Sequence, residues 1–300
     1  MGCKSMVSSE YGKRRRINRI LNNCKTLIVP VDDSLIFGPI GGLFNIEKTI
    51  SEIEESAPSA ILGYKGSLSL VNSINIPLIM NVTASTIRGN HVSKTIISSV
   101  EEAVCMDTVC VAAHVNYTCE YENKMIIQLS NIVREAEKYG MPVLSISYPR
   151  KIVNGNDYEY EDLSEGEYTD LICHCTRVSV ELGADIIKTK FTGSAESFER
   201  VVDSAMGRPV IIAGGPLVEV EKAYEMAKAV IDAGAAGISY GRNVFNQNNI
   251  KAFIEGIKEI IFEGADVSKA IDTYRRCIDV GLEKYESVVH GFTAFASNKN

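Results

Sequence analysis

The chain has 300 residues, of which 45% are hydrophobic and 23% are charged, an ordinary composition for one globular α/β domain. Its net charge of −7 argues against nucleic acid as the main partner, since phosphate backbones require clustered lysine and arginine. We find no apolar run near the length of about 18 residues that suits a membrane span and no signal peptide. We therefore expect a cytoplasmic protein without a membrane partner, its cysteines reduced.

The chain opens with an expected helical extension over residues 1–24. Its one basic run, Lys13 to Arg16, is predicted to begin the first helix and is typical of a solvated helix face. We place a barrel over residues 25–265, and a C-terminal helix and tail over residues 266–300.

Eight short apolar runs rich in strand-forming residues follow the extension. Nearly continuous apolar strands indicate a parallel sheet that is covered on its faces. The predicted strands are Thr26 to Asp32, Ala60 to Gly63, Pro77 to Thr83, Thr108 to Val115, Pro142 to Tyr148, Ala184 to Lys190, Pro209 to Ala213 and Gly237 to Gly241.

Longer amphipathic segments separate these strands, and glycine signals such as Tyr139-Gly140 mark helix ends before the next strand. Eight β/α units in one chain predict a (β/α)₈ TIM barrel with a single domain. The alternative, an open doubly wound sheet, usually carries a G-x-G-x-x-G fingerprint after its first strand, where this chain has Pro30-Val31-Asp32-Asp33. The predicted helices are Asn45 to Ser56, Glu120 to Tyr139, Glu165 to Leu182, Ala195 to Met206 and Leu217 to Ala233.

Two further segments carry structural predictions. Asn154 to Glu167 is acidic and rich in tyrosine and glycine, and we interpret it as a loop that covers a site. Val267 to Val288 shows the apolar stripe of one more helix. This helix is predicted to pack on the barrel wall or to form an oligomer interface, and the sequence leaves both open.

Candidate catalytic residues gather at the carboxyl ends of the predicted strands, where barrel active sites lie. Lys188 and Lys190 end the sixth strand, two residues apart and therefore on the same face. Burial and the second cation would both favour a neutral amine, which attack on a ketone requires. The alternative is that one lysine lies past the strand end and meets solvent or phosphate.

Asp32 and Tyr148 end the first and fifth strands and suit proton transfer beside an iminium. As alternatives, Asp32 is a plausible helix N-cap and Tyr148 a core aromatic. His114, at the end of the fourth strand, is either a core histidine or a possible substrate contact.

Glycine turns follow the last two strands and precede helices. Gly214-Gly215 and Gly241-Arg242 offer backbone amides and a guanidinium, a pattern typical of a phosphate site in barrels, although such turns also serve only to reverse the chain. We predict no metal and no cofactor, since Cys173-His174-Cys175 would point in different directions on a helix.

These motifs together resemble the archaeal-type class I aldolase family. The resemblance covers about Lys13 to Ala270, and within the family the 2-amino-3,7-dideoxy-D-threo-hept-6-ulosonate synthases are most similar. The segments that carry it are Val29 to Asp32, Gly38 to Ile40, Ser147 to Arg150, Ile187 to Gly193, Ile212 to Pro216 and Gly241 to Phe245.

The resemblance implies a Schiff-base lysine at Lys188, a proton-transfer tyrosine at Tyr148 and the family's motif aspartate at Asp32. It implies phosphate-binding turns at Gly214-Gly215 and Gly241-Arg242, and assembly as a homo-oligomeric ring, often a decamer.

The chain departs from the family pattern at several positions. Where the family usually has Asp-His-Gly after strand one, this chain has Asp32-Asp33-Ser34. Where the family has a neutral residue at the end of the sixth strand, this chain has Lys190. Lys151 and Asn246 replace a glycine and a glutamine. We hypothesise that Asp33 pairs with Lys190 or Lys151 and alters the substrate; alternatively, Asp33 is an ordinary loop carboxylate.

The predicted activity is that of a class I aldolase, lyase or transaldolase, acting on a phosphorylated sugar or triose and a small aldehyde. The resemblance implies L-aspartate semialdehyde as acceptor. Alternatives are its condensation with dihydroxyacetone phosphate, fructose-bisphosphate cleavage, and a barrel that binds a phosphate ligand without catalysis.

Overall fold

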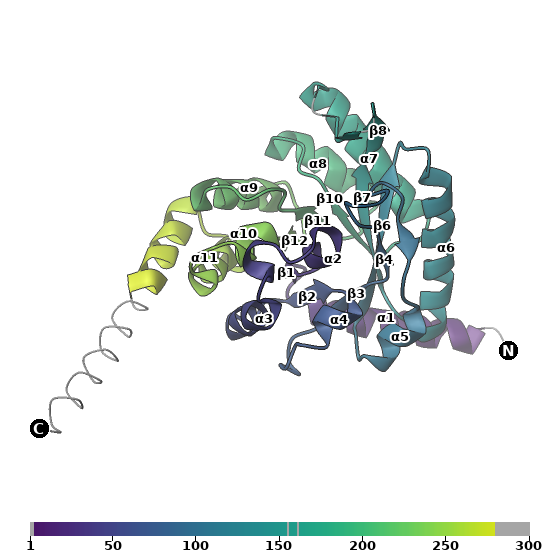
Figure 1. Cartoon of the computed structure of the whole chain (residues 1–300), viewed down its shortest axis with the longest axis horizontal. Helices are drawn as coiled ribbons and strands as arrows, with labels where there is room; N and C mark the ends of the chain where they lie inside the picture. The colour runs from purple at the N-terminus through teal and green to yellow at the C-terminus, as the bar shows by residue number, and fades with distance from the viewer. Residues whose placement is uncertain (1–2, 155, 161, 280–300) are drawn as a thin grey trace, which may run out of the picture.

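The computed structural model describes residues 3–154, 156–160 and 162–279. At its centre eight parallel strands close into a barrel (Figure 1), which confirms the predicted fold. The order around the barrel is β1-β12-β11-β10-β7-β6-β3-β2. The strand bounds are Thr26–Pro30 (β1), Ala60–Gly63 (β2), Leu78–Asn81 (β3), Cys110–Tyr117 (β6), Val143–Pro149 (β7), Ile186–Thr189 (β10), Val210–Ala213 (β11) and Gly237–Ser239 (β12).

Alternate strand residues build two separate cores. Ile28, Leu62, Ile146 and Ile186 belong to the small cluster inside the barrel, whereas their strand neighbours pack in the larger cluster under the helices. Because side chains alternate across a strand, Lys188 points the same way as Ile186, into the barrel. The two-sided burial explains why the strands are almost continuously apolar.

The predicted amphipathic helices are confirmed with small shifts at their ends, and they cover the outside of the barrel (Figure 1). Serines begin several of them: Ser164 and Ser194 accept from the backbone amides three residues on, which satisfies free helical N–H groups. The larger helices are α3 (Ile46–Glu55), α6 (Glu122–Tyr139), α7 (Glu165–Glu181), α8 (Ala195–Ser204), α9 (Val220–Asp232) and α11 (Ile250–Glu263); the shorter ones are α2 (Asp33–Phe37), η1 (Gly41–Leu43), α4 (Lys65–Leu68), α5 (Val100–Cys105) and α10 (Arg242–Phe245).

Two short hairpins stand on the loops at the carboxyl ends of the strands. One pairs β4 (Thr83–Ala84) with β5 (Thr95–Ile96), and the other pairs β8 (Lys151–Val153) with β9 (Asn156–Tyr158). The second hairpin lies partly in the segment that we predicted as a loop. Backbone pairing therefore gives this acidic segment a defined place beside the cavity described below.

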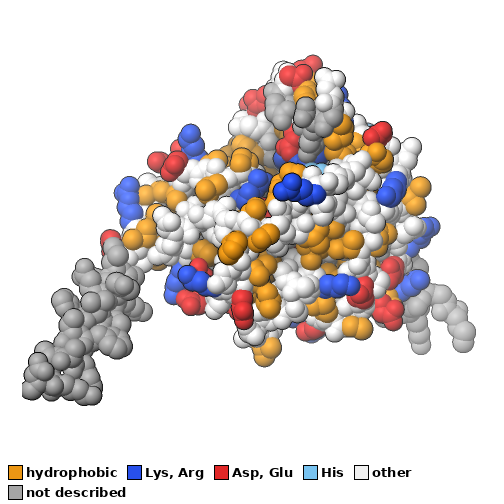
Figure 2. Space-filling view, viewed as in Figure 1, with side chains coloured by type: hydrophobic (Ala, Val, Ile, Leu, Met, Phe, Trp, Pro, Cys, Tyr) orange, Lys and Arg blue, Asp and Glu red, His pale blue; other side chains and the backbone are white. Residues whose placement is uncertain are grey.

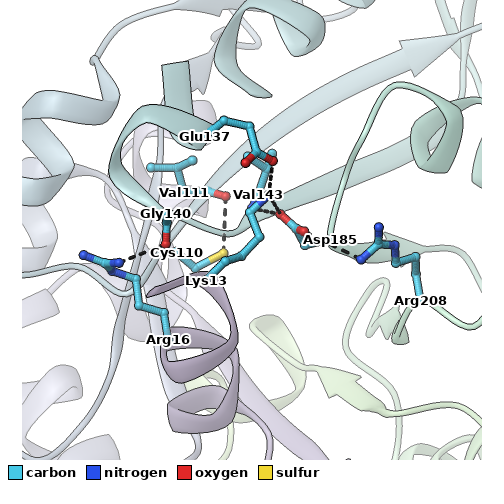
Figure 3. A network of polar contacts seen from close by, with 9 residues as sticks. All are labelled: Lys13, Arg16, Cys110, Val111, Glu137, Gly140, Val143, Asp185 and Arg208. Atoms are coloured by element: carbon cyan, nitrogen blue, oxygen red, sulfur yellow. Dashed lines mark hydrogen bonds and ion pairs between the residues drawn. The ribbon is translucent and has the colours of Figure 1, made fainter. Parts of the chain in front are cut away.

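Helix α1 (Cys3–Ile20) begins ten residues before the predicted basic run, and it packs at the amino end of the barrel. Lys13 reaches Glu137 and lies 3.2 Å from Asp185, while Arg16 donates to the carbonyl oxygen of Gly140 at 2.9 Å (Figure 3). The predicted solvated face is therefore wrong for these two residues, because Lys13 pairs with the buried Asp185 and Arg16 binds the carbonyl oxygen that ends α6. Arg14 and Arg15 do lie exposed.

The C-terminal helix begins at residue 267 and continues to residue 279, and its predicted remainder, residues 280–288, lies outside the described residues. Ala270 is fully buried and the ring of Tyr274 packs edge-on to Tyr224 of α9, 6.5 Å between centroids. The described part thus packs on the barrel wall. No described helix is long and apolar enough to cross a membrane. On the face shown in Figure 2, acidic and basic side chains are interspersed.

Candidate active site

A cavity of about 860 Å³ opens at the carboxyl ends of the barrel strands. All the candidate residues predicted from the sequence line it, except Lys190. The lining polar or glycine residues are Asp32, Asp33, Gly89, Asn90, His91, His114, Tyr148, Arg150, Glu159, Lys188, Gly214, Gly215, Ser239, Gly241 and Arg242.

Lys188 lies on β10 inside the barrel, 6% exposed and flanked in register by Ile146 and Ile211. Burial lowers the pKa of its amine; the carboxylates Asp32 and Asp33 act the other way, and Arg242 adds to the lowering. Within the described part of the chain, its Nζ makes no hydrogen bond or ion pair. A buried amine with a lowered pKa, open to a cavity, is suited to nucleophilic attack on a carbonyl.

Asp32 follows β1 and is almost fully buried. It occupies the N-cap position of α2, but its side chain makes no capping hydrogen bond. Instead its Oδ2 accepts from Nδ2 of Asn81, at 3.0 Å, at the end of β3. The carboxylate is thus held toward the cavity rather than toward the helix end.

Asp33 lies beside Arg242, with 3.4 Å between Oδ2 and Nε. Burial raises its pKa to about 6; the neighbouring charge of Asp32 acts in the same direction, and Arg242 and Lys188 oppose it. The hypothesis that Asp33 pairs with Lys190 or Lys151 is wrong. Asp33 follows β1 and Arg242 follows β12, and these two strands pair where the barrel closes. The linear sequence does not reveal this pairing.

Tyr148 is the last residue but one of β7, and the ring of His114 on β6 meets it edge-on, with centroids 4.9 Å apart. Burial is the main cause that raises the pKa of Tyr148 and keeps it a neutral proton donor. Burial, followed by Lys94 and Arg150, lowers the pKa of His114 well below its ordinary value. Among described residues, the buried Nε2 of His114 has no hydrogen-bond partner, unlike a satisfied core histidine.

Lys190 follows the last residue of β10, which agrees with the alternative that one lysine lies past the strand end. Its Nζ bonds to Glu159 at 2.6 Å and sits 5.2 Å from the ring centre of Tyr148. Glu159 also pairs with Arg150. The lysine thus covers the tyrosine from outside, and the cation that acts on Lys188 is Arg242.

The glycine turns after β11 and β12 lie side by side on the cavity. The Gly214 amide donates to Ser239 at 3.1 Å, whereas the amides of Gly215 and Gly241 have no partner among the described residues. Gly215 adopts a φ of 66°, a conformation that favours glycine. The fully buried Asn243 amide donates to the carbonyls of Gly214 and Pro216 and so joins the two turns.

Our sequence reasoning missed the segment after β3 as a site element. Lys94 is 1% exposed and its Nζ bonds to Ser85 at 2.8 Å. Burial, then Lys94 and Arg150, lowers the pKa of His91 to about 3. Isolated residues in a long loop carry no periodic signal, and the sequence neighbours of Lys94, Ser93 and Thr95, are polar, so nothing in the sequence marked this lysine as buried.

A second missed feature is the fit of the loop after α2 against α10. A Cβ on Gly42 would lie 1.6 Å from the carbonyl oxygen of Phe245, so only glycine fits. The Gly42 amide donates to the side chain of Asn246 at 3.0 Å. The changed last residue of the motif therefore anchors the loop that follows α2, the helix that begins at Asp33.

The Cys173-His174-Cys175 triplet lies on α7, with Cys175 buried and His174 exposed, so the side chains diverge. Within the described residues no group of three or more metal-ligating side chains gathers.

A closed barrel with a buried lysine that has no ion pair among the described residues, beside a carboxylate and a phenol, defines a Schiff-base type of active site. Comparison with known proteins agrees: the DeoC/LacD family aldolase profile matches residues 26–247. The chain therefore belongs to this family and is a class I aldolase.

Individual relatives cover nearly the whole barrel. The chain is 34% identical to 2-amino-3,7-dideoxy-D-threo-hept-6-ulosonate synthase of Halobacterium salinarum, over 88% of this chain and 96% of that protein. It is 29% identical to 2-amino-4,5-dihydroxy-6-oxo-7-(phosphonooxy)heptanoate synthase of Streptomyces griseus, over 85% and 92%. A solved Schiff-base-forming fructose-1,6-bisphosphate aldolase superposes with a TM-score of 0.74 at 26% identity, over 83% of this chain and 100% of the other.

Proposed function

We propose that this aldolase binds a ketose or triose phosphate and forms its Schiff base through Lys188. The observation that carries the proposal is the Lys188 amine itself: buried, with a lowered pKa, open to the cavity and outside any ion pair among the described residues. A lysine in such a place is costly unless it works as a neutral amine.

The chemistry follows from the groups around this amine. The Lys188 nitrogen attacks the keto carbon and water leaves, giving an iminium. The bond between the carbons α and β to the iminium carbon then breaks. Its electron pair moves toward the iminium and forms an enamine, and an aldehyde departs. In condensation the neutral phenol of Tyr148 gives its proton to the aldehyde oxygen as the carbon–carbon bond forms, and in cleavage the phenolate takes that proton from the substrate hydroxyl. Asp32 stabilises the positive charge on nitrogen. Condensation follows the reverse course.

The phosphate is assigned to the turns after β11 and β12. Gly215 and Gly241 offer open amides there, and Arg242 contributes a guanidinium from the start of α10. Gly214 acts through its carbonyl bond to Asn243, since its amide is already engaged by Ser239. Barrels commonly hold phosphate at these two loops.

An acidic aldehyde is proposed as the acceptor. Across the barrel mouth from β11 and β12 stand β3 and β6. This side carries the imidazoles of His91 and His114, which are neutral hydrogen-bonding groups because their pKa values are lowered, and the charged side chains of Arg150, after the neighbouring β7, and Lys94, buried behind them. L-Aspartate semialdehyde, with its carboxylate, suits this wall. The name of the Streptomyces relative gives a product with a phosphonooxy group, which fits dihydroxyacetone phosphate as donor in direct condensation. The resemblance to the heptulosonate synthases implies instead a deoxyketose phosphate in transaldol transfer. Fructose-bisphosphate cleavage is the third candidate.

Borohydride reduction with dihydroxyacetone phosphate tests the proposal. We expect a reduced adduct located at Lys188 by peptide mass spectrometry, and no adduct in Lys188→Met. Lys228→Met, on the surface of α9, is the matched control. Phosphate binding without an adduct would instead identify a barrel that binds ligand without catalysis.

Product analysis identifies the substrates. Triose and deoxyketose phosphates are each incubated with aspartate semialdehyde, and products are identified by mass spectrometry. Activity that disappears in excess chelator would favour a metal-dependent aldolase over the Schiff-base reaction.

We also propose that the enzyme works in the cytoplasm as a homo-oligomer, as the family resemblance implies. Sedimentation analysis of the full chain measures the assembly; a monomer at micromolar concentration contradicts it.

A further inference from the structure

The phosphate end of the cavity already contains a resident carboxylate. Asp33 lines the same cavity as Gly215 and Gly241, and its Oδ2 lies 3.4 Å from Nε of Arg242. The side chain of Asp33 is 20% exposed, and that of Arg242 is 39% exposed. A phosphate that binds Arg242 must therefore share the guanidinium with Asp33 or displace it.

Charge decides between these outcomes. With Asp32 and Asp33 both ionised, a phosphate dianion would bring four negative charges against Arg242 and a Lys188 amine that is neutral for catalysis. Like charges gathered at one partly buried end of a cavity repel one another. One of the three anionic groups has to lose charge when the phosphate binds.

The contacts of the two carboxylates show which one changes. Asp32 has a hydrogen-bond donor of its own, the Asn81 amide at 3.0 Å. Asp33, among described residues, receives no hydrogen bond and has Arg242 as its ion-pair partner. Once phosphate takes that arginine, no donor remains to stabilise the Asp33 carboxylate.

We propose that Asp33 is a phosphate-binding residue that releases Arg242 when the substrate phosphate arrives, takes up one proton from solvent and donates a hydrogen bond to a phosphate oxygen. A protonated carboxyl supplies one O–H donor, so the group changes from competitor to ligand. This inference rests on the proposed phosphate site.

The other groups that face Asp33 do not replace it in this role. Burial, and then the charge of Asp32 from its own segment, raise the pKa of Asp33; Arg242 and Lys188, from α10 and β10, lower it, and the net value is about 6. Burial raises the pKa values of Tyr148 on β7 and Tyr64 after β2, and the charge of Asp33 acts in the same direction. Both phenols therefore stay neutral. Among the described groups on the cavity, Lys188, His114 and His91 have lowered pKa values and can also take up a proton, so the experiment must separate them from Asp33.

Titration calorimetry with inorganic sulfate tests the inference, because sulfate keeps its charge between pH 5.5 and 8.5. Measurement in two buffers with different heats of ionisation counts the protons taken up. For the wild-type enzyme we expect affinity that is flat below about pH 6 and falls about tenfold per pH unit above it, with uptake of about one proton per anion.

Variants assign that proton. Asp33→Asn should bind sulfate without proton uptake, with little pH dependence and about 100-fold more tightly than wild type at pH 8, two pH units above the pKa of about 6. Asp203→Asn, an exposed carboxylate on α8, should behave as wild type. Arg242→Gln should lose sulfate binding.

Three results would overturn the inference: no proton uptake in the wild type, uptake that persists in Asp33→Asn, or the same pH slope in wild type and Asp33→Asn. The wild-type count needs no variant to fold. A borohydride adduct at Lys188 obtained alongside a failed proton count would leave the Schiff-base assignment standing and remove Asp33 alone.

Discussion

The two ends of the barrel treat buried charge in opposite ways. At the amino end Asp185 has Lys13 at 3.2 Å and Arg208 at 3.8 Å, and it accepts from the Val143 amide at 2.9 Å (Figure 3). At the carboxyl end, Lys188 is equally buried but has no such partner among the described residues. The comparison separates charges that hold the fold together from charges that remain available for chemistry.

Burial raises the pKa of Asp185, and its partners, led by Lys13, act against that rise. Burial likewise lowers the pKa of Lys188. The nearby carboxylates of Asp32 and Asp33 act against this lowering, but neither forms an ion pair with the amine among the described residues. The same physical cost is thus offset by pairing at one end, and is retained at the other because the reaction uses the neutral amine.

The largest expected effect tests the carboxyl end. Lys188→Ala should abolish turnover, because no other described amine opens on the cavity from inside the barrel. Steady-state rates and borohydride trapping measure it. Lys228→Ala, whose ion pair with Asp232 lies on the surface, should keep wild-type rates. Residual turnover in Lys188→Ala well above background would contradict its role as nucleophile.

Tyr148→Phe should slow turnover by about 10²–10⁴-fold if the phenol transfers the proton. The ring contact with His114 would survive, so folding should change little. We expect the loss mainly in kcat, with the Lys188 adduct still trapped by borohydride. A rate near that of the wild type would remove the proton-transfer role.

For the amino end of the barrel we expect the reverse pattern, a loss of stability without a loss of activity. Lys13→Met should lower the free energy of unfolding by about 3 kcal/mol, at the lower end for a broken buried ion pair because Arg208 still faces Asp185. Denaturant titration measures it, and the rate per folded molecule should stay unchanged. Arg14→Met, in the exposed part of the same run, serves as the control. Equal loss in both variants would mean that α1 is held by something other than this pair.

The smallest effect concerns Asp33. Because its pKa rises from 3.8 to about 6 on folding, the folded state binds more protons in this window, and stability falls as pH rises through it. Asp33→Asn should therefore match the wild type at pH 4 and exceed it by about 2 kcal/mol at pH 8, a value below the full shift because the group is partly solvated. Thermal unfolding across this range checks it. A pH-independent difference would contradict the raised pKa.

The barrel and most of its helices followed from local patterns. Continuous apolar runs gave the strands, helical spacing gave the helices, and the carboxyl ends of the strands gave Lys188, Tyr148 and Asp32. These features are local because they depend on which side of an element faces the core. The same reasoning failed for Lys13, since a basic run looks identical whether it meets solvent or a buried acid.

The sequence by itself determined the barrel, the strand that carries the lysine and the two glycine turns, because periodicity and chain order suffice to set them. Only the tertiary structure decided the partners: Asp33 pairs with Arg242 rather than Lys190, and Lys13 with Asp185. It also decided that Lys94 is buried near His91 and His114. The closed sheet brings first and last strands together, and long side chains choose among neighbours by distance and burial, which no linear pattern records.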